Sequence, residues 1–230
     1  MLEPREDQLF IGAALPLNRI ARQPLVVRHA QALVEACDLV GGPQVRNVAT
    51  LGGNVAHALP AADGTIALLA LGAEAEIAGL SGNRRLPFAD LFLGPGKSAL
   101  KQGEELLVGF YLPLSKKGQA SCFKRIMRPQ GVALPIINLA IRLEREKDAI
   151  KDIRIAVGPG APTPWRAREA ERALIGKPMQ DDTFTAALEA LLAHVGFRSS
   201  PRRASADYRR HLVGTLFKDT LETARNRAGL

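Results

Sequence analysis

The residues with the clearest chemical potential lie in the segment 44–63, which reads QVRNVATLGGNVAHALPAAD. It sets a hydroxyl, two adjacent glycines and a carboxamide ahead of the acid Asp63; these are Thr50, Gly52, Gly53 and Asn54. Glycines can take positive φ, so that successive N–H groups converge on an anion. The spacing therefore predicts a tight turn that binds phosphate. For a bare Leu-Gly-Gly-Asn sequence the alternative is a glycine hairpin with polar ends.

Read as a whole, this segment resembles the second flavin-binding motif of the FAD-binding (medium) subunit of molybdenum hydroxylases, the family of xanthine dehydrogenase and carbon monoxide dehydrogenase. The family pattern is filled here by Arg46, Asn47, Thr50, Leu51, Gly52, Gly53, Asn54, Pro60 and Asp63. The resemblance continues through residues 68–76, 94–98, 105–107, 123–125, 158–164, 170–177 and 205–209. It accounts for nearly the whole chain.

The resemblance implies a set of FAD-binding residues. The nucleotide would be held by Thr50, Leu51, Gly52, Gly53 and Asn54. Asp63 matches an acid that lines the flavin site, Leu107 a residue that packs on the flavin ring, and Lys124 a basic residue near it. A positive charge there would stabilise the reduced, anionic flavin. The structural alternatives are a helix cap for Asp63, a core leucine for Leu107 and a surface charge for Lys124.

The resemblance also implies an oxidoreductase subunit that is inert towards substrate on its own. FAD would collect electrons from iron–sulfur clusters of a partner and hand them to NAD⁺ or another acceptor. The implied partners are a molybdopterin-binding large subunit and a small subunit with 2Fe-2S clusters. The rival hypothesis is a flavin-free assembly or docking subunit, or a truncated fragment of such an enzyme.

One part of the family pattern has no match before Gln44, namely an earlier glycine-rich motif of the type Ala-Gly-Gly-Thr. We therefore expect the chain to start inside the pattern, either from a start assigned at an internal methionine or in a shortened protein. Losing two charge-assisted hydrogen bonds to the pyrophosphate would cost roughly 3 to 6 kcal/mol, or about 10² to 10⁴ in affinity. That loss is the basis of the flavin-free alternative.

Composition sets further bounds. The chain has 230 residues, 47% of them hydrophobic, which is enough for one large domain or two of about 100 residues. It has only two cysteines, Cys37 and Cys122, so four-thiolate ligation of an iron–sulfur cluster within the chain is impossible. Both are expected in the core, and any cluster must sit on a partner. The four histidines lack metal-ligand spacing, and no metal site is expected.

The net charge is +8, and much of the excess lies late in the chain at Arg198, Arg202, Arg203, Arg209, Arg210 and Lys218. We expect a solvated helix face or a docking surface rather than nucleic-acid binding, because aromatic residues make up only 5% and no recognised motif accompanies the cluster. No apolar run approaches the roughly 20 residues that span a bilayer. Residues 1–7 lack the features of a signal peptide, so a cytoplasmic protein is expected.

The elements that must position these residues divide into two groups, with a predicted domain boundary after residue 116. In the first group we expect strands at 9–13, 74–78 and 105–112, a helix at 27–40 ended by two glycines, and a helix from Asp63 to Gly72. By resemblance, residues 1–116 form an incomplete FAD-binding domain of the vanillyl-alcohol-oxidase type, with a mainly antiparallel sheet and helices.

Residues 117–230 predict a smaller C-terminal domain, a three-stranded antiparallel sheet with helices, so the fold class is α+β. The strands are expected at 121–127, 133–143 and 150–157, and the last alternates as a sheet with one covered face does. Helices are expected from Thr163, with Pro164 first, to Gly176, from Asp182 or Thr183 to Val195, and from Ser205 to about Arg225.

Overall fold

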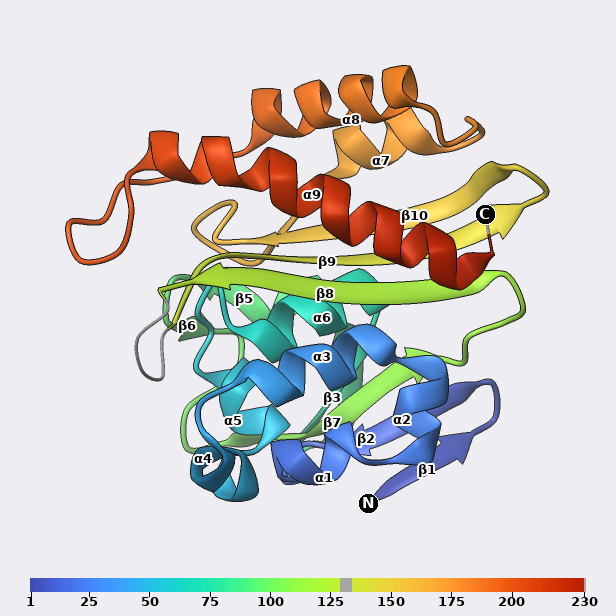
Figure 1. Ribbon diagram of the computed structural model, residues 1–230. Helices are drawn as coiled ribbons and strands as arrows, with labels where there is room; N and C mark the ends of the chain where they lie inside the picture. Colours follow the sequence, from blue (N-terminus) through green and yellow to red (C-terminus); the bar gives the residue numbers. More distant parts are fainter. Residues whose placement is uncertain (129–133, 230) are drawn as a thin grey trace.

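The chain folds into helices and antiparallel sheets, which confirms the α+β prediction. The structure is a computed structural model that describes residues 1–128 and 134–229 (Figure 1). Its helices are α1 (Leu17–Ala21), α2 (Pro24–His29), α3 (Gln31–Leu39), α4 (Pro43–Val48), α5 (Leu51–Ala56), α6 (Asp63–Leu71), the 3-10 helix η1 (Phe88–Leu91), α7 (Arg168–Leu174), α8 (Asp181–His194) and α9 (Ala206–Ala228).

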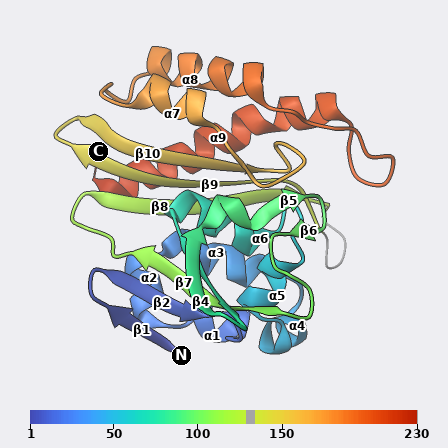
Figure 2. The same ribbon diagram turned by 180° about the vertical axis from the view of Figure 1, so that it is seen from behind.

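The strands form two main sheets, both antiparallel. The first has the order β1-β2-β7-β3-β4 and the second the order β11-β10-β9-β8, while β5 and β6 pair separately (Figure 2). The strands are β1 (Leu2–Arg5), β2 (Gln8–Gly12), β3 (Glu74–Gly79), β4 (Gly82–Pro87), β5 (Phe92–Gly94), β6 (Lys97–Ser98), β7 (Glu105–Pro113), β8 (Gln119–Met127), β9 (Pro135–Glu146), β10 (Ala149–Gly158) and β11 (Trp165–Arg166).

The central element of the fold is α6, which lies between the two sheets (Figures 1 and 2). Every residue from Asp63 to Leu71 is buried. A helix that is apolar on all sides is stable only when it is covered on all sides. It contacts β7 of the first sheet and β9 and β10 of the second. As predicted, Gly72 ends the helix, in the left-handed conformation with φ 72°.

The second sheet is covered on both faces, whereas the sequence predicted one covered face. Ile153, Ile155 and Val157 pack into a core with α7, α8 and α9. The opposite face carries small residues: Ala140 and Ala156 are paired in register and belong to the other core, which includes α3 and α6. These short side chains let α6 approach the sheet closely.

Several element boundaries differ from the predictions. The helix predicted at 27–40 is two helices, because Ala30 leaves the helical conformation with φ −143° and ψ 51°. The helix predicted from Thr163 starts at Arg168 instead, because Trp165 and Arg166 pair with β10 as a fourth strand of the sheet. The strand predicted from Ala133 is described from Pro135, since Ala133 lies outside the described residues.

Two further predictions are confirmed. Ser205 caps α9, and its hydroxyl accepts the Tyr208 N–H at 3.1 Å. Both cysteines are buried, and burial raises the pKa of each thiol, that of Cys122 to about 12. Within the described residues, no helix combines the length and the hydrophobicity needed to cross a bilayer.

Candidate functional site

The Gly-Gly segment is the first turn of a short helix, α5, and the predicted tight turn with positive φ is wrong. Thr50 is the N-cap residue, and its Oγ1 accepts the Gly53 N–H at 3.0 Å. Neither Gly52 nor Gly53 has positive φ. A hydroxyl before an N-terminal helical turn satisfies an otherwise unpaired N–H group, and this explains the local fold.

The first N–H groups of α5 already have acceptors inside the chain. Leu51 N–H donates to the Leu15 carbonyl at 3.2 Å, and Gly52 N–H donates to the Ala13 carbonyl at 2.8 Å. With Gly53 N–H bound to Thr50, the first three amides of the helix are engaged. The start of α5 is therefore docked on the segment that follows β2.

The two glycines serve different purposes. A Cβ on Gly52 would lie 2.7 Å from the Ala13 Cβ and 2.8 Å from the Ala13 carbonyl oxygen, so this position has no room for a side chain. A Cβ on Gly53 would meet only the Thr50 Oγ1, at 3.2 Å. Gly52 thus permits close packing, whereas Gly53 is exposed and leaves the backbone open to a ligand.

Asp63 is the first residue of α6 rather than its cap, since Ala62 occupies the N-cap position. Its carboxylate is only 4% exposed. Oδ2 accepts from Arg125 Nη1 at 2.5 Å, and Oδ1 accepts from Asn138 Nδ2 at 2.6 Å. Burial raises the pKa of Asp63, and the Arg125 charge and the Asn138 hydrogen bond oppose that shift. The predicted capping role is therefore replaced by a buried ion pair between α6 and β8.

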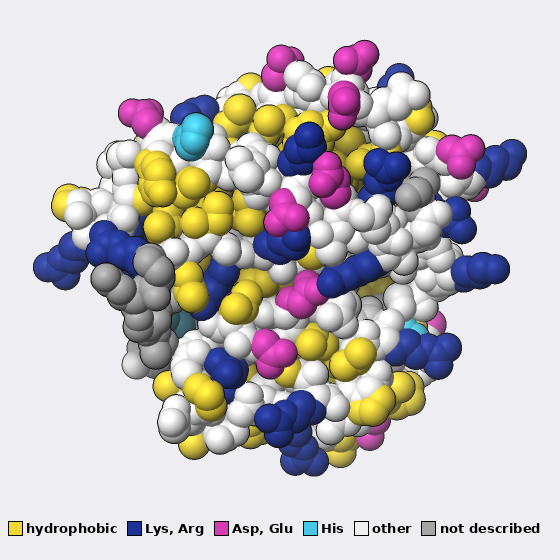
Figure 3. Space-filling view, in the orientation of Figure 1, with side chains coloured by type: hydrophobic (Ala, Val, Ile, Leu, Met, Phe, Trp, Pro, Cys, Tyr) yellow, Lys and Arg dark blue, Asp and Glu magenta, His cyan; other side chains and the backbone are white. Residues whose placement is uncertain are grey.

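A cavity of about 510 Å³ brings these residues together. It is a typical size for a small-molecule site. Gly53 and Asn54 of α5, the C-cap residue His57, Asp63 and Arg125 all line it. Its basic side chains come from the C-terminal half: Arg198, Arg202, Arg203 and Arg209. In Figure 3, Lys and Arg side chains gather at the edge of the molecule where the loop into α9 lies in Figure 1.

Two observations in the cavity wall fit a nucleotide cofactor. The Asn54 Oδ1 and the Arg125 Nε are buried and have no hydrogen-bond partner within the described residues. Such atoms in a native protein are usually satisfied by a ligand or water. Apart from Asp63, which is paired, the described lining carries only positive charge among its charged groups. An anionic ligand with polar ring edges would satisfy both features.

Leu107 and Lys124 do not line this cavity. Leu107 lies on β7, is half-buried, and packs against the core that includes α6. Lys124 lies on β8 and its Nζ contacts Asp219 Oδ1 of α9 at 2.5 Å. Successive side chains of a strand point to opposite faces, so it is the next residue, Arg125, that reaches the cavity. The flavin roles of Leu107 and Lys124 stay predictions.

Sequence reasoning missed Arg125, Asn138 and the use of the C-terminal arginines. The segment 123–125 matches the family pattern and contains two basic residues, Lys124 and Arg125. Strand alternation tells which of the two faces the cavity only once the covered face of the sheet is known. Asn138 gives no local signal, because it acts through a contact with a helix 75 residues earlier.

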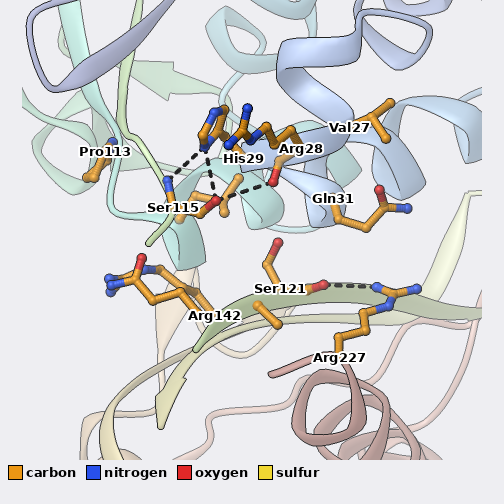
Figure 4. A pocket seen from close by; sticks show the side chains of 12 residues that line it. Val27, Arg28, His29, Gln31, Pro113, Ser115, Ser121, Arg142 and Arg227 are labelled. Atoms are coloured by element: carbon orange, nitrogen blue, oxygen red, sulfur yellow. Dashed lines mark hydrogen bonds between the residues drawn. The ribbon is translucent and has the colours of Figure 1, made fainter. Parts of the chain in front are cut away.

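A second cavity, of about 310 Å³, lies between the α2–α3 region and β8 (Figure 4). His29 Nδ1 accepts the Ser115 N–H at 3.1 Å, and Ser115 Oγ donates to the Arg28 carbonyl at 3.2 Å. Burial and the Arg28 charge lower the pKa of His29, so its neutral form is favoured. Arg227 reaches in from α9 and donates to the Ser121 carbonyl at 2.9 Å. None of these residues was predicted as a site.

Comparison with known proteins identifies the family of the chain. Residues 1–115 match the family model described as the FAD binding domain in molybdopterin dehydrogenase. The chain belongs to this family of FAD-binding subunits. Residues 121–224 match the model of the CO dehydrogenase flavoprotein C-terminal domain.

Individual relatives of this FAD-binding subunit family agree. The xanthine dehydrogenase FAD-binding subunit of Escherichia coli O157:H7 is 34% identical over 226 residues, which cover 97% of this chain and 76% of the relative. The carbon monoxide dehydrogenase medium chain of Hydrogenophaga pseudoflava is 29% identical over 94% of this chain and 74% of the relative.

Solved structures show the same family fold. The carbon monoxide dehydrogenase of Hydrogenophaga pseudoflava that lacks the Mo-pyranopterin moiety superposes with a TM-score of 0.93 at 29% identity, covering 99% of this chain and 78% of that chain. The predicted resemblance to FAD-binding subunits of molybdenum hydroxylases is therefore confirmed, and the protein is an oxidoreductase subunit of that family.

Proposed function

We propose that FAD occupies the cavity between α5, α6 and β8, and that the protein passes electrons from iron–sulfur clusters of a partner subunit to NAD⁺ or another acceptor. The observation that carries this proposal is that Gly53, Asn54, Asp63 and Arg125 line one cavity, and that Asn54 Oδ1 and Arg125 Nε have no hydrogen-bond partner among the described residues. The family match supports the nature of the cofactor.

The residues of the chain have distinct roles in this proposal. When bound, FAD would accept electrons one at a time and donate them in pairs. Gly53 leaves room for the cofactor against α5, while Thr50, Leu51 and Gly52 hold that helix in place through its cap, its packing and its backbone hydrogen bonds. Asn54 and Arg125 offer an acceptor and a donor. Leu107 and Lys124 belong to the proposal through the family match alone.

Asp63 would act through its ion pair. Arg125 and Asn138 each bind one carboxylate oxygen, so the carboxylate is fixed in the cavity wall. Its negative charge is balanced by the positive charge of Arg125. The wall thus stays electrostatically suited to an anionic cofactor.

The partners proposed are a molybdopterin-binding large subunit and a small subunit with 2Fe-2S clusters. The relatives named as a medium chain and an FAD-binding subunit support this, since such names denote parts of larger enzymes. The chain has only two cysteines, too few to hold a cluster by four thiolates. It would therefore be inactive towards the complex's substrate when alone.

A flavin-free docking subunit is the second candidate. One observation favours it: the N–H groups of Leu51, Gly52 and Gly53 already bind acceptors within the chain, so they are not available to a pyrophosphate. In that case the same fold would serve assembly of the complex only.

Absorption spectroscopy with an FAD titration separates the two candidates. The purified chain is titrated beside Gly53→Arg, which fills the open side of α5, and beside Val48→Arg, which adds the same charge at an exposed position of α4 outside the cavity. A flavin function predicts visible flavin bands that Gly53→Arg abolishes and Val48→Arg preserves. A colourless chain that does not bind FAD at high micromolar concentration would overturn the flavin function and favour a flavin-free docking subunit or a truncated fragment.

A further inference from the structure

Four arginines of the C-terminal half line the flavin cavity without a carboxylate partner. They are Arg198, Arg202, Arg203 and Arg209. Among the described residues, no carboxylate oxygen lies within 4.0 Å of any of them. Asp63 is the one acid in the described lining, and it is paired with Arg125. The positive charge of the four arginines is therefore not balanced by the described protein groups around the cavity.

The case is sharpest for Arg209, which is only 2% exposed. Its Nε donates to the Ile136 carbonyl at 2.9 Å and its Nη1 donates to the Arg198 carbonyl. Carbonyl oxygens satisfy hydrogen bonds but do not neutralise the charge. Burial and the nearby charges of Arg203 and Arg198 lower the pKa of Arg209. A buried charge without a counter-charge is costly, and an anionic ligand would remove that cost.

The exposed arginines sit on an ordered turn between α8 and α9. Ser200 N–H donates to the Ala204 carbonyl at 2.9 Å, and Arg203 N–H donates to the Ser200 carbonyl at 3.1 Å. Ser199 Oγ accepts the N–H of Ala206, the first residue of α9, at 3.0 Å. The turn is thus tied to the start of α9, which also carries Arg209. Arg198, just before the turn, Arg202 and Arg203 within it, and the buried Arg209 all line the same cavity.

We propose that Arg198, Arg202, Arg203 and Arg209 form a phosphate-binding subsite of the flavin cavity. The inference rests on the proposed function in that the cavity receives a nucleotide. Guanidinium groups bind phosphate oxygens in a bidentate manner, which suits a pyrophosphate better than a single carboxylate. The phosphate has two sources: the pyrophosphate of FAD itself, or that of a dinucleotide acceptor that docks beside the flavin.

The first experiment asks whether the subsite exists. Inorganic pyrophosphate is titrated into the full chain by calorimetry, for wild type, for Arg202→Gln/Arg203→Gln, and for Lys116→Gln/Lys117→Gln. The control removes the same two charges from exposed positions outside the cavity. We expect the arginine variant to lose about tenfold or more in affinity and the lysine control to change little, with wild-type affinity falling as salt rises. Equal affinity in both variants would overturn the proposal.

The second experiment distinguishes the two sources. FAD and riboflavin, which has no phosphate, are titrated into the same variants by flavin fluorescence. If the subsite holds the FAD pyrophosphate, the arginine variant binds FAD about tenfold more weakly than wild type, and its affinity for riboflavin is unchanged. If it holds the acceptor, FAD affinity is unchanged and the concentration of NADH needed for half-maximal reduction of the bound flavin rises by a similar factor.

The failure of this proposal differs from the failure of the flavin proposal. If the chain binds pyrophosphate through Arg202 and Arg203 but does not bind flavin, the subsite proposal stands and the flavin proposal fails. If FAD binding and the reaction with NADH are identical in wild type and in the arginine variant, the flavin proposal stands and the subsite proposal fails.

Arg209→Lys keeps the buried positive charge but loses the paired N–H donors of the guanidinium group. A tenfold weaker pyrophosphate affinity in that variant would support bidentate binding.

Discussion

Asp63 and Arg125 form a buried ion pair that joins the start of α6 to β8. The Oδ2–Nη1 distance is 2.5 Å, and the two side chains are 4% and 7% exposed. The residues are 62 positions apart and come from the two predicted domains. Since Asn138 of β9 holds the other carboxylate oxygen, the pair fixes the central helix against the second sheet at the wall of the cavity in which we propose FAD binds.

The first prediction concerns the loss of one partner. Arg125→Gln leaves Asp63 buried with only the Asn138 hydrogen bond. Removing one partner of a buried pair costs about 3 to 5 kcal/mol, because the remaining charge is uncompensated. We expect a lower free energy of unfolding in urea denaturation at neutral pH. The double variant Asp63→Asn/Arg125→Gln removes both charges and should recover part of this loss; if it is no more stable than Arg125→Gln, the pair is not the cause.

The second prediction is the pH dependence of that defect. Burial raises the folded-state pKa of Asp63, and the Arg125 charge is the largest opposing influence, so Arg125→Gln raises this pKa further. The folded state then binds more protons than the unfolded state between the two pKa values. The group's contribution to stability is complete below the unfolded pKa and is lost as pH rises through the folded pKa. Relative to wild type, the variant should therefore lose most stability near neutral pH and least at about pH 4. A deficit that is independent of pH would contradict this.

The third prediction separates the two adjacent glycines. Gly52→Ala puts a Cβ 2.8 Å from the Ala13 carbonyl oxygen and must push α5 away, which we expect to cost about 1 to 3 kcal/mol. Gly53→Ala meets only the end of the Thr50 side chain and replaces glycine within a helix, so stability should be unchanged or rise by up to about 1 kcal/mol. Thermal unfolding measures both, and equal destabilisation would contradict the assignment.

The variant Gly53→Ala also tests the proposed cofactor site. Gly53→Ala narrows the open side of α5, and we expect FAD affinity to fall by about tenfold although the protein is fully folded. A folded Gly53→Ala protein with wild-type FAD affinity would show that the cofactor does not touch this turn.

The fourth prediction concerns Glu35 of α3. Its Oε2 accepts the Phe123 N–H at 2.7 Å, and its Oε1 contacts Arg227 Nη2 at 2.5 Å. β8 pairs with β9 alone among the described strands, so Glu35 satisfies a backbone donor on the free edge of the sheet. Glu35→Ala should cost about 1 to 3 kcal/mol through that buried donor, since the partly exposed ion pair with Arg227 adds little.

Hydrogen exchange provides the specific readout for Glu35. The Phe123 amide should exchange much faster in Glu35→Ala and only moderately faster in Glu35→Gln, which keeps one acceptor. Glu169→Ala breaks an exposed ion pair with Arg172 and serves as the control, with little effect on stability. If Glu35→Ala behaves like this control, Glu35 does not support the edge of the sheet.

The local signals in the sequence predicted most elements well. The alternation of Ile153, Ile155 and Val157, the glycine after α6 and the serine before α9 all act within a few residues of where they are read. The failures have a common physical cause. Trp165 and Arg166 form a strand because β10 offers them an edge, and that long-range pairing overrode the helix signal of Pro164.

The site was predicted in part for the same reason. The segment from Thr50 to Asn54 and Asp63 was found from its residue order, and the structure brings Gly53, Asn54 and Asp63 to one cavity. The backbone amides predicted to bind phosphate are engaged instead with Ala13, Leu15 and Thr50, contacts that no spacing reveals. The sequence predicts only a solvated helix face or a docking surface for the basic cluster, because its place beside α5 depends on how the second sheet packs on α6.

The last prediction concerns the thiols. Cys37 and Cys122 are both fully buried, and burial raises the pKa of Cys122 to about 12. Because the thiolate is the reactive form, only about one molecule in 10⁴ would carry it at about pH 8. We expect the folded chain to leave an aromatic disulfide reagent unreduced for hours and to release two equivalents of thiol in urea, in step with unfolding. Rapid reaction of one equivalent in the folded chain, assigned by comparing Cys37→Ala with Cys122→Ala, would mean that the core around that residue opens without global unfolding.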